Sequence, residues 1–355
     1  MSSEWMYDVD IPLLPNMAKE YQIHYFFFSN PESPRVKKEE VVEFARRSNI
    51  VLHWKDHSIR QLSPRNLISY FALAKEIEAL SPFLILRQEP SFYWSVVSKL
   101  FMRTKTVYFI HDVEVHSGTH NGKIRQLFSD LTICLNKHFI LFSNSQYAIF
   151  RRRYGEKNCL VTHLSVKVFG KPTVSRPPVS EGIKLLFFGR IEYNKGLDIL
   201  IDGLERLFQK GITNLSLSIC GKGSYWEECS KHIKTPKNYN IDVRYIANEE
   251  IANIFASHHF LVLPYRDTTQ SGPLMIAANY GLPLLGYDHD SFREIYNDSN
   301  AIFYEDIDKA LQKISAMGQP QYDGYADACK DLKERFSGSN IAKQISSFIK
   351  NLDNK

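Results

Sequence analysis

Two cations in the second half of the sequence lie where a phosphate could bind. Arg190 follows the apolar run Ile183–Phe188 and Gly189, and Lys195 comes later in the same polar stretch. A guanidinium can grip a phosphate through two hydrogen bonds, and a lysine ammonium adds a point charge. The glycine would let a ligand approach the backbone. We interpret this stretch as an anion-binding loop, in preference to two solvated charges beside a turn.

A second polar loop, Thr268–Gly272, supports that interpretation. The apolar residues Leu261–Leu263 predict a short buried strand that ends at a proline. Ser271 is a good N-cap and Pro273 suits the first helical turn, so a helix should begin here. Its first turn would direct unpaired N–H groups and a positive dipole end at the loop, which favours a phosphate. The alternative is an ordinary strand-to-helix connection.

The other polar motifs are weaker. The turn Gly221-Lys222-Gly223 follows a predicted strand and could face a ligand. Neither a P-loop nor a G-x-G-x-x-G run after a strand is present, which argues against a kinase, a P-loop NTPase or a dehydrogenase. None of the three D-x-D sequences directly follows a buried strand in a convincing setting, and we take them as chance. The basic run Arg151–Arg153 is interpreted as a solvated helix face, which would touch anionic lipid if the acceptor is membrane-bound.

His111 is the polar residue of interest in the first half. It follows the buried strand predicted at Thr106–Ile110. A histidine in this position could hydrogen-bond a substrate or move a proton near neutral pH. A metal site with Asp112 and His116 is a weaker alternative, because the spacing is loose and no H-E-x-x-H accompanies it. A histidine that caps the strand and bonds only to backbone is the third.

Composition limits the class of protein. The 355 residues are 44% hydrophobic and 13% aromatic, as expected for two well-packed domains. A net charge of +5 fits anionic small molecules and is too small to indicate nucleic acid. The five cysteines are scattered, which favours a reducing cytosol over disulfides or zinc. No signal peptide or bilayer-length apolar run occurs, so we expect a cytoplasmic protein, at most peripheral to the inner face of the membrane.

Strand-like and helix-like segments alternate along the whole chain, which predicts parallel, doubly wound α/β sheets. We expect an N-terminal Rossmann-like domain over residues 1–170, a linker at 171–182 and a second Rossmann-like domain over 183–337. The helix within 338–355 is expected to pack back on the first domain. Met1–Asp10 does not have a strand pattern, so the first domain should lack its first strand, and the recorded start could lie downstream of the true one.

Ile183–Ile295 resembles the nucleotide-sugar domain of retaining GT-B glycosyltransferases of family 4. The landmarks are FFGRIEYNKGLDILIDGLERL, LSICGKGS, the run from YIANEEIANIF to GLPLL, and FREI. In the first domain, His111 within FIHDVEVHSG matches the strand-end histidine of the family. The resemblance implies the GT-B fold, in which two Rossmann-like domains face a cleft.

The resemblance also assigns roles to residues. Arg190 and Lys195 would hold the donor diphosphate and stabilise the leaving group. Backbone amides around Gln270, Ser271 and Gly272 would help, with Gly189 and Gly221 also at the donor. His111 would contact the transferred sugar. Such a site needs no metal and no cofactor, since fixed cations and a helix N-terminus can take the leaving charge.

One departure from the family concerns two glutamates separated by seven residues, which would fall on Thr268 and Ile276. The second glutamate usually holds the ribose hydroxyls, so the grip on the nucleotide must differ or be weaker here. Subgroup members with a TQSG-like loop resemble this chain more closely.

The leading hypothesis is a retaining glycosyltransferase that moves a sugar from a nucleoside diphosphate sugar to a hydroxyl. The acceptor would be a glycan or a lipid-linked saccharide of a surface polysaccharide. A nucleotide-sugar 2-epimerase shares the two-domain fold but would require acidic groups near C2. A degenerate binding protein without catalytic activity is the third hypothesis, which the two missing glutamates favour.

Overall fold

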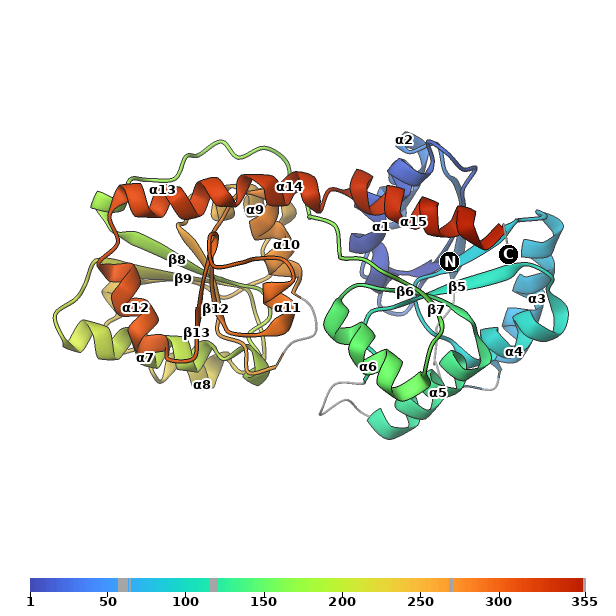
Figure 1. Ribbon diagram of the computed structural model, residues 1–355, viewed down its shortest axis with the longest axis horizontal. Helices are drawn as coiled ribbons and strands as arrows, with labels where there is room; N and C mark the ends of the chain where they lie inside the picture. Colours follow the sequence, from blue (N-terminus) through green and yellow to red (C-terminus); the bar gives the residue numbers. More distant parts are fainter. Residues whose placement is uncertain (57–62, 64, 115–120, 268–270, 354–355) are drawn as a thin grey trace. The chain divides into compact units, whose positions relative to one another are not determined.

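The computed structural model describes residues 1–56, 63, 65–114, 121–267 and 271–353. The chain divides into two compact units (Figure 1). The first unit comprises Met1–Ser165 with Gly338–Lys355, and the second comprises Val166–Ser337. The boundary thus lies a few residues before the one expected at residue 170. The proline-rich segment expected as a separate linker belongs to the second unit.

The first unit is built on parallel strands. β1 (Ser2–Ser3), β2 (His24–Ser29) and β3 (Val51–Asp56) pair in the order β1-β2-β3, and β4 (Leu84–Arg87), β5 (Lys105–Ile110), β6 (His138–Leu141) and β7 (Asn158–Val161) pair in sequence order. Met1 joins the two sets, because its ammonium donates to the Leu86 carbonyl at 2.7 Å and its carbonyl accepts from Gln88 N–H at 3.0 Å.

The two sets of strands together form the sheet layer of the first unit. Helices cover both faces of this layer, as a doubly wound fold requires. On one face, α3 (Asn66–Ala79), α4 (Phe92–Phe101), α5 (Gly122–Leu135) and α6 (Asn144–Tyr154) bury a core that includes Trp94 and Phe139. Figure 1 shows these helices next to one another along the unit. On the other face lie α1 (Tyr7–Met17), α2 (Lys38–Arg47) and α15 (Gly338–Asp353).

The N-terminal segment corrects one prediction. Ser2 and Ser3 form a short strand, in register with Phe27 and Phe28 of β2, although the sequence has no strand pattern there. The helix α1 that follows begins at Tyr7 and contains Pro12 and Pro15. A cavity of about 370 Å³ lies next to Met1 and is lined by residues of β2 and β4, among others. Burial lowers the pKa of the Met1 ammonium to about 5, although the nearby Asp10 carboxylate opposes this.

The C-terminal helix α15 is part of the first unit, where it packs on α1. Gly338 begins the helix so close to α1 that a Cβ there would lie 2.0 Å from the Pro12 carbonyl oxygen. The Lys350 ammonium reaches Glu20 at 2.8 Å, and the Lys105 ammonium donates to the Leu352 carbonyl at 2.9 Å. Apolar residues of α15, including Ile345, complete the core on this face of the sheet.

The second unit has one parallel sheet in the order β10-β9-β8-β11-β12-β13. The strands are β8 (Ile183–Phe188), β9 (Leu215–Cys220), β10 (Tyr239–Asp242), β11 (Phe260–Leu263), β12 (Leu284–Tyr287) and β13 (Ala301–Tyr304). The order reverses at β8, so that β8 lies between β9 and β11. The loops after β8 and β11 therefore leave the same edge of the sheet side by side, and ligands bind at such a point in open α/β sheets.

The helices of the second unit alternate with its strands. They are α7 (Leu197–Gln209), α8 (Trp226–Ser230), α9 (Asn248–Ala256), α10 (Gly272–Asn279), α11 (Asp290–Arg293), α12 (Ile307–Ser315), α13 (Gln319–Ala328) and α14 (Lys330–Arg335). The buried stripe of α7, which includes Leu200, Leu204 and Leu207, packs on the sheet together with α12. Both units are thus Rossmann-like, as predicted.

Two buried histidines of the second unit should make its stability depend on pH. The His259 ring accepts from Lys184 N–H at 2.9 Å and contacts the Pro177 carbonyl at 3.0 Å, and His258 lies beside the Ser218 hydroxyl at 2.7 Å. Burial lowers the pKa of each histidine from 6.5 to about 4. The unfolded chain therefore takes up these protons first as the pH falls.

We expect the free energy of unfolding to be fully retained above pH 6.5 and to fall progressively toward pH 4, by roughly 1–3 kcal/mol for each histidine. Urea melts of the wild type and of His259→Gln at pH 7.5, 5.5 and 4.5 measure this contribution. The difference between the two proteins should shrink as the pH falls. A difference that is constant over this range would contradict the neutral, hydrogen-bonded state of His259.

Candidate active site

The loop after β8 and the loop after β9 interlock through their glycines. Gly189 has φ +120° and donates its N–H to the Cys220 carbonyl at 2.9 Å. Gly221 has φ +140°, and a Cβ on it would lie 1.9 Å from the Gly189 carbonyl oxygen. The missing side chain of Gly221 lets its backbone approach that of Gly189, whereas a Cβ on Gly189 itself would lie 3.5 Å from the Pro273 side chain. The ligand approach that we inferred for Gly189 stays a prediction. The contact fixes the start of the loop that carries Arg190.

The end of the same loop is fixed against the loop after β11. Gly196 has φ +65°, and a Cβ on it would lie 1.9 Å from the Pro264 carbonyl oxygen. Only glycine permits this approach without a shift of the backbone. It brings Lys195 over the ring of Tyr265, with the ammonium nitrogen 3.8 Å from the ring centroid. Lys195 and the predicted phosphate loop after β11 are therefore adjacent.

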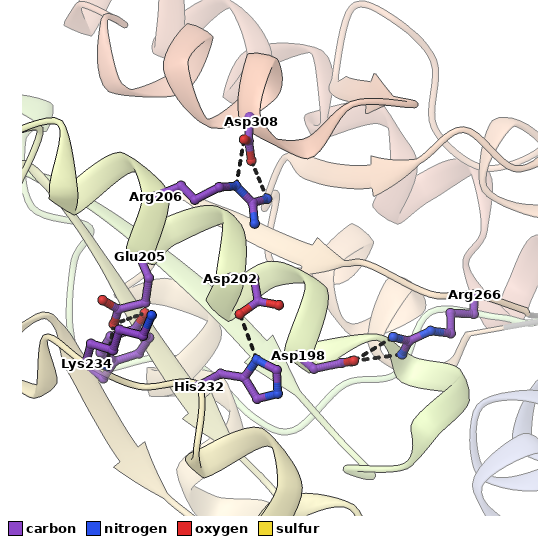
Figure 2. Close-up of polar contacts among 9 residues, drawn as sticks. Asp198, Asp202, Glu205, Arg206, His232, Lys234, Arg266 and Asp308 are labelled. Atoms are coloured by element: carbon purple, nitrogen blue, oxygen red, sulfur yellow. Dashed lines mark hydrogen bonds and ion pairs between the residues drawn. The ribbon is translucent and has the colours of Figure 1, made fainter.

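An ion pair between Arg266 and Asp198 holds the two loops together (Figure 2). The guanidinium donates to both carboxylate oxygens of Asp198, at 2.8 and 2.6 Å, and to the Tyr193 carbonyl at 2.7 Å. The Arg266 N–H also donates to the Asn194 carbonyl at 2.9 Å. Arg266 lowers the pKa of Asp198 against the effect of its burial, so the carboxylate is charged at neutral pH. The sequence did not reveal this pair, although an arginine three residues after the end of β11 was a visible signal.

Arg190, Lys195, Tyr265 and Ser271 form a polar cluster, and its electrostatics favour an anionic ligand. Burial and, to a smaller extent, the charge of Arg190 lower the pKa of Lys195 to about 8, against a smaller opposing effect of Asp267. Burial also raises the pKa of Tyr265 to about 12, against a hydrogen bond with Ser271 and the charge of Arg190. Lys195 is partly buried and Arg190 is exposed, and the two cations repel each other. A ligand that carries negative charge would offset this repulsion and the lost hydration of Lys195.

The helix start after β11 forms as predicted. Ser271 is the N-cap of α10, where its hydroxyl accepts from Leu274 N–H at 3.4 Å. Gly272 begins the helix, and the Lys167 ammonium nitrogen lies close to it, 3.8 Å from the place of a Cβ at that position. Lys167 is a further cation at this helix start, which the sequence did not reveal because it lies in the segment before β8. Gln270 lies outside the described residues.

His111 belongs to the first unit, where it follows β5. Its ring packs against Phe142 with centroids 4.8 Å apart. Burial lowers its pKa to about 4, so the imidazole is neutral at physiological pH, although Asp112 opposes the shift. A neutral imidazole can hydrogen-bond a sugar hydroxyl without adding charge. Of the alternative metal ligands, His116 lies outside the described residues, and within the described parts of the chain no three His, Cys, Asp or Glu residues are grouped to hold a metal.

The positions of the two family glutamates bear on nucleotide binding. Ile276 is buried within α10 and contributes to the apolar packing of that helix. It cannot accept a hydrogen bond from a ribose. Thr268 lies outside the described residues. A nucleotide would therefore have to be held at its ribose by a group other than a carboxylate at position 276.

Further polar contacts tie α7 to its neighbours (Figure 2). Glu205 is buried and accepts from the backbone N–H groups of Lys234 and Thr235, both at 3.0 Å. Arg206 donates to both oxygens of Asp308 of α12, at 2.8 and 2.7 Å. These contacts position α7, and through its N-terminus the loop that carries Lys195.

Residues 182–319 match the family model described as "Glycosyl transferases group 1". The second unit carries a glycosyl transferases group 1 domain. No curated protein matches the chain in sequence. The prediction of a glycosyltransferase is confirmed by this domain. The assignment to family 4 and the individual residue roles stay predictions.

Solved structures show the fold of the chain. A glycosyltransferase from Rickettsia africae is similar with a TM-score of 0.75 at 12% identity, over 100% of this chain and 98% of that one. The lipopolysaccharide outer core galactosyltransferase WaaB has a TM-score of 0.70 at 16% identity, over 98% and 95%. Anabaena HepE, solved with UDP and glucose, has a TM-score of 0.69 at 14% identity, over 97% and 95%. The chain spans 58% of the length of S. aureus TarM, at a TM-score of 0.62 and 14% identity. The predicted GT-B fold is confirmed.

Breaking the ion pair between Arg266 and Asp198 should loosen the cluster. We expect Arg266→Ala to destabilise the group 1 domain by about 3 kcal/mol, because a partly buried carboxylate loses its partner. Asp198→Asn should cost less, since the amide keeps one hydrogen bond. Urea melts of both single variants and of the double variant measure the coupling. Arg244→Ala, which breaks exposed ion pairs with Asp242 and Glu250, is the matched control and should cost less than about 1 kcal/mol. If the losses of stability in the two single variants add up to the loss in the double variant, the ion pair does not hold the two loops together.

Proposed function

We propose that this glycosyltransferase moves a sugar from a nucleoside diphosphate sugar to a hydroxyl of a glycan or lipid-linked acceptor, with retention of the anomeric configuration. The observation that carries the proposal is the assembly of Lys195, Tyr265 and Ser271 next to Arg190, at the N-terminus of α10. Such a cluster suits a diphosphate, which carries more charge as a leaving group than it does in the intact sugar nucleotide.

At the anomeric carbon, one bond breaks and one forms. The bond between this carbon and the diphosphate oxygen breaks, the acceptor oxygen bonds to the same carbon, and the acceptor proton passes to the departing diphosphate. Arg190 and Lys195 would neutralise the charge that develops on the leaving oxygen, and the N–H groups at the start of α10 would add hydrogen bonds. We propose that this occurs without a metal, because fixed cations already occupy the place where a metal would act.

The proposal extends to the donor, the acceptor and the location of the enzyme. The solved structure of HepE holds UDP, so a uridine diphosphate sugar is the first donor to test. We propose an acceptor on the way to a surface polysaccharide, and a cytoplasmic enzyme that works at the inner face of the membrane. Within the described residues, no helix is long and apolar enough to cross a bilayer.

A donor panel tests the proposal. The protein is incubated with UDP-, GDP- and ADP-sugars, each with and without glycan or lipid-linked acceptors, and released nucleoside diphosphate is measured. We expect release that requires both one donor and one acceptor, and a product whose anomeric proton coupling matches that of the donor. Conversion of a free sugar nucleotide into its 2-epimer without acceptor would overturn the proposal in favour of the epimerase. If no nucleoside diphosphate raises the melting temperature, donor binding itself is refuted.

A further inference from the structure

Three neighbouring helices of the first unit expose large apolar side chains. α3 exposes Leu67 and Ile68, α4 ends in Leu100 and Phe101, and α5 carries Ile124, Leu127 and Leu131. Their exposed fractions range from 37% at Leu67 to 77% at Ile68. α4 contacts both α3 and α5, and Figure 1 shows the three helices together on one face of the unit. We refer to these seven residues as the apolar face.

The helix α5 shows most clearly that the apolar face is not part of the core. Ile124, Leu127 and Leu131 recur at the spacing of one helical stripe, and all three are exposed. The side of α5 that faces the sheet instead buries Thr132 and Ile133. The apolar stripe of this helix therefore points to solvent, the reverse of an ordinary surface helix. An exposed apolar stripe of this kind usually marks an interaction surface.

Basic residues adjoin the apolar face in the sequence, on both sides of Leu100–Phe101 and of Ile124. Lys99, Arg103, Lys123 and Arg125 are all exposed. Among the described residues, none of these four forms an ion pair with an acidic side chain. α4 contains no acidic residue, and the only one in α5 is Asp130. Asp130 is already bound by Arg153 at 2.8 Å and by the Tyr154 hydroxyl at 2.6 Å.

The charge of this surface selects its occupant. A symmetric dimer through the apolar face would bring the same four cations of two copies toward each other, which is unfavourable. An anionic bilayer supplies the opposite charge over an extended plane and an apolar layer just beneath it. We propose that helices α3, α4 and α5 form a docking surface for an anionic lipid bilayer, with the apolar face inserted at the level of the headgroups.

The proposed insertion is shallow and reversible. The apolar side chains come from the outer sides of three helices that otherwise pack on the sheet, so insertion requires no unfolding of the unit. Apolar burial and attraction to anionic headgroups then contribute together, and salt should weaken only the second contribution. The inference does not depend on the donor site, because all of its residues belong to the first unit.

Co-sedimentation of the full chain with vesicles tests the proposal. Vesicles of phosphatidylcholine with one quarter phosphatidylglycerol are compared with vesicles of phosphatidylcholine alone, at low and at high salt. We expect binding to the anionic vesicles that is at least tenfold stronger and that weakens with salt. Equal binding to both kinds of vesicle, or none to either, would overturn the proposal.

Two sets of variants locate the surface. The first is a triple variant of α5, which should reduce binding at least tenfold (Ile124→Ser, Leu127→Ser, Leu131→Ser). Its matched control replaces three exposed apolar residues elsewhere and should bind as the wild type does (Val42→Ser, Val174→Ser, Ile241→Ser). Replacing the four cations of the surface by Gln should also reduce binding (Lys99, Arg103, Lys123, Arg125). The control for this quadruple variant replaces four exposed lysines of the second unit by Gln, which changes the net charge by the same amount and should leave vesicle binding unchanged (Lys171, Lys210, Lys237, Lys313).

Two further measurements make the outcome decisive. Circular dichroism and thermal melting confirm that each variant is folded, and UDP binding by calorimetry reports the donor site separately. Normal UDP binding without vesicle binding would refute the docking surface and leave the proposed function intact. Loss of vesicle binding in both triple variants alike would refute the assignment to α5. A concentration-dependent dimer that only the Ile124, Leu127 and Leu131 variant abolishes would identify a second copy as the occupant and overturn the proposal.

Discussion

Lys195→Ala is expected to lower kcat for sugar transfer by about 10²–10³-fold while leaving the fold intact, as is typical when one preorganised charge at a developing anion is removed. The Lys195 ammonium lies 3.8 Å above the Tyr265 ring and next to Arg190, where burial lowers its pKa to about 8. A buried cation of this kind needs no reorganisation when the diphosphate leaves. Steady-state rates of nucleoside diphosphate release measure the effect, and circular dichroism measures the fold.

The same lysine should be visible in the pH profile. Its ammonium is charged below pH 8 and neutral above, so kcat/KM of the wild type for the donor should fall as the pH rises through about 8. Bound diphosphate favours the charged form, so kcat should fall at a higher pH than kcat/KM does. Lys195→Arg keeps a charge that does not titrate in this range, and its profile should lack this step.

Lys210→Ala is the matched control for the loss of a positive charge. Lys210 is exposed and caps the opposite end of α7, far along the helix from Lys195. It should retain the wild-type rate. A Lys195→Ala enzyme that also turns over at the wild-type rate would refute the role of this residue at the diphosphate.

The sequence was sufficient to predict the features that depend on local pattern. The alternation of strands and helices, the polar loop after Ile183–Phe188 and the helix start at Ser271 each rest on neighbouring residues. The structure adds that the loop after β8 and the loop after β11 are adjacent, because β8 pairs with β11. Strand order cannot be derived from periodicity, so that adjacency was an inference from resemblance.

What the sequence did not reveal depends on contacts between distant residues. Arg266 and Asp198 are far apart in the chain, and each alone looks like a solvated charge. Lys167 reaches the start of α10 from a segment that has no periodicity. The strand Ser2–Ser3 has no pattern of its own and forms because β2 offers it a paired register. In each case the partner, and not the residue type, decides the structure.

The structural role of Gly196 also depends on a contact with a residue that is distant in the sequence. Gly196→Ala is expected to destabilise the group 1 domain by about 3 kcal/mol or more. Its Cβ would lie 1.9 Å from the Pro264 carbonyl oxygen, so the loops after β8 and β11 must move apart. The positive φ of +65° adds a smaller cost of about 1 kcal/mol for any residue with a side chain. Urea melts at neutral pH measure the loss.

Gly211→Ala separates the two causes. Gly211 has a similar φ of +81°, but a Cβ there meets no atom within 4 Å, so it should show only the conformational cost of about 1 kcal/mol. Gly196→Ala should in addition weaken binding of UDP, because it shifts Lys195 from Tyr265, whereas Gly211→Ala should leave that affinity unchanged. If both variants lose equal stability, the close approach of Gly196 to Pro264 does not hold the loops together. In that case the position of Lys195 must depend on the ion pair between Arg266 and Asp198 alone.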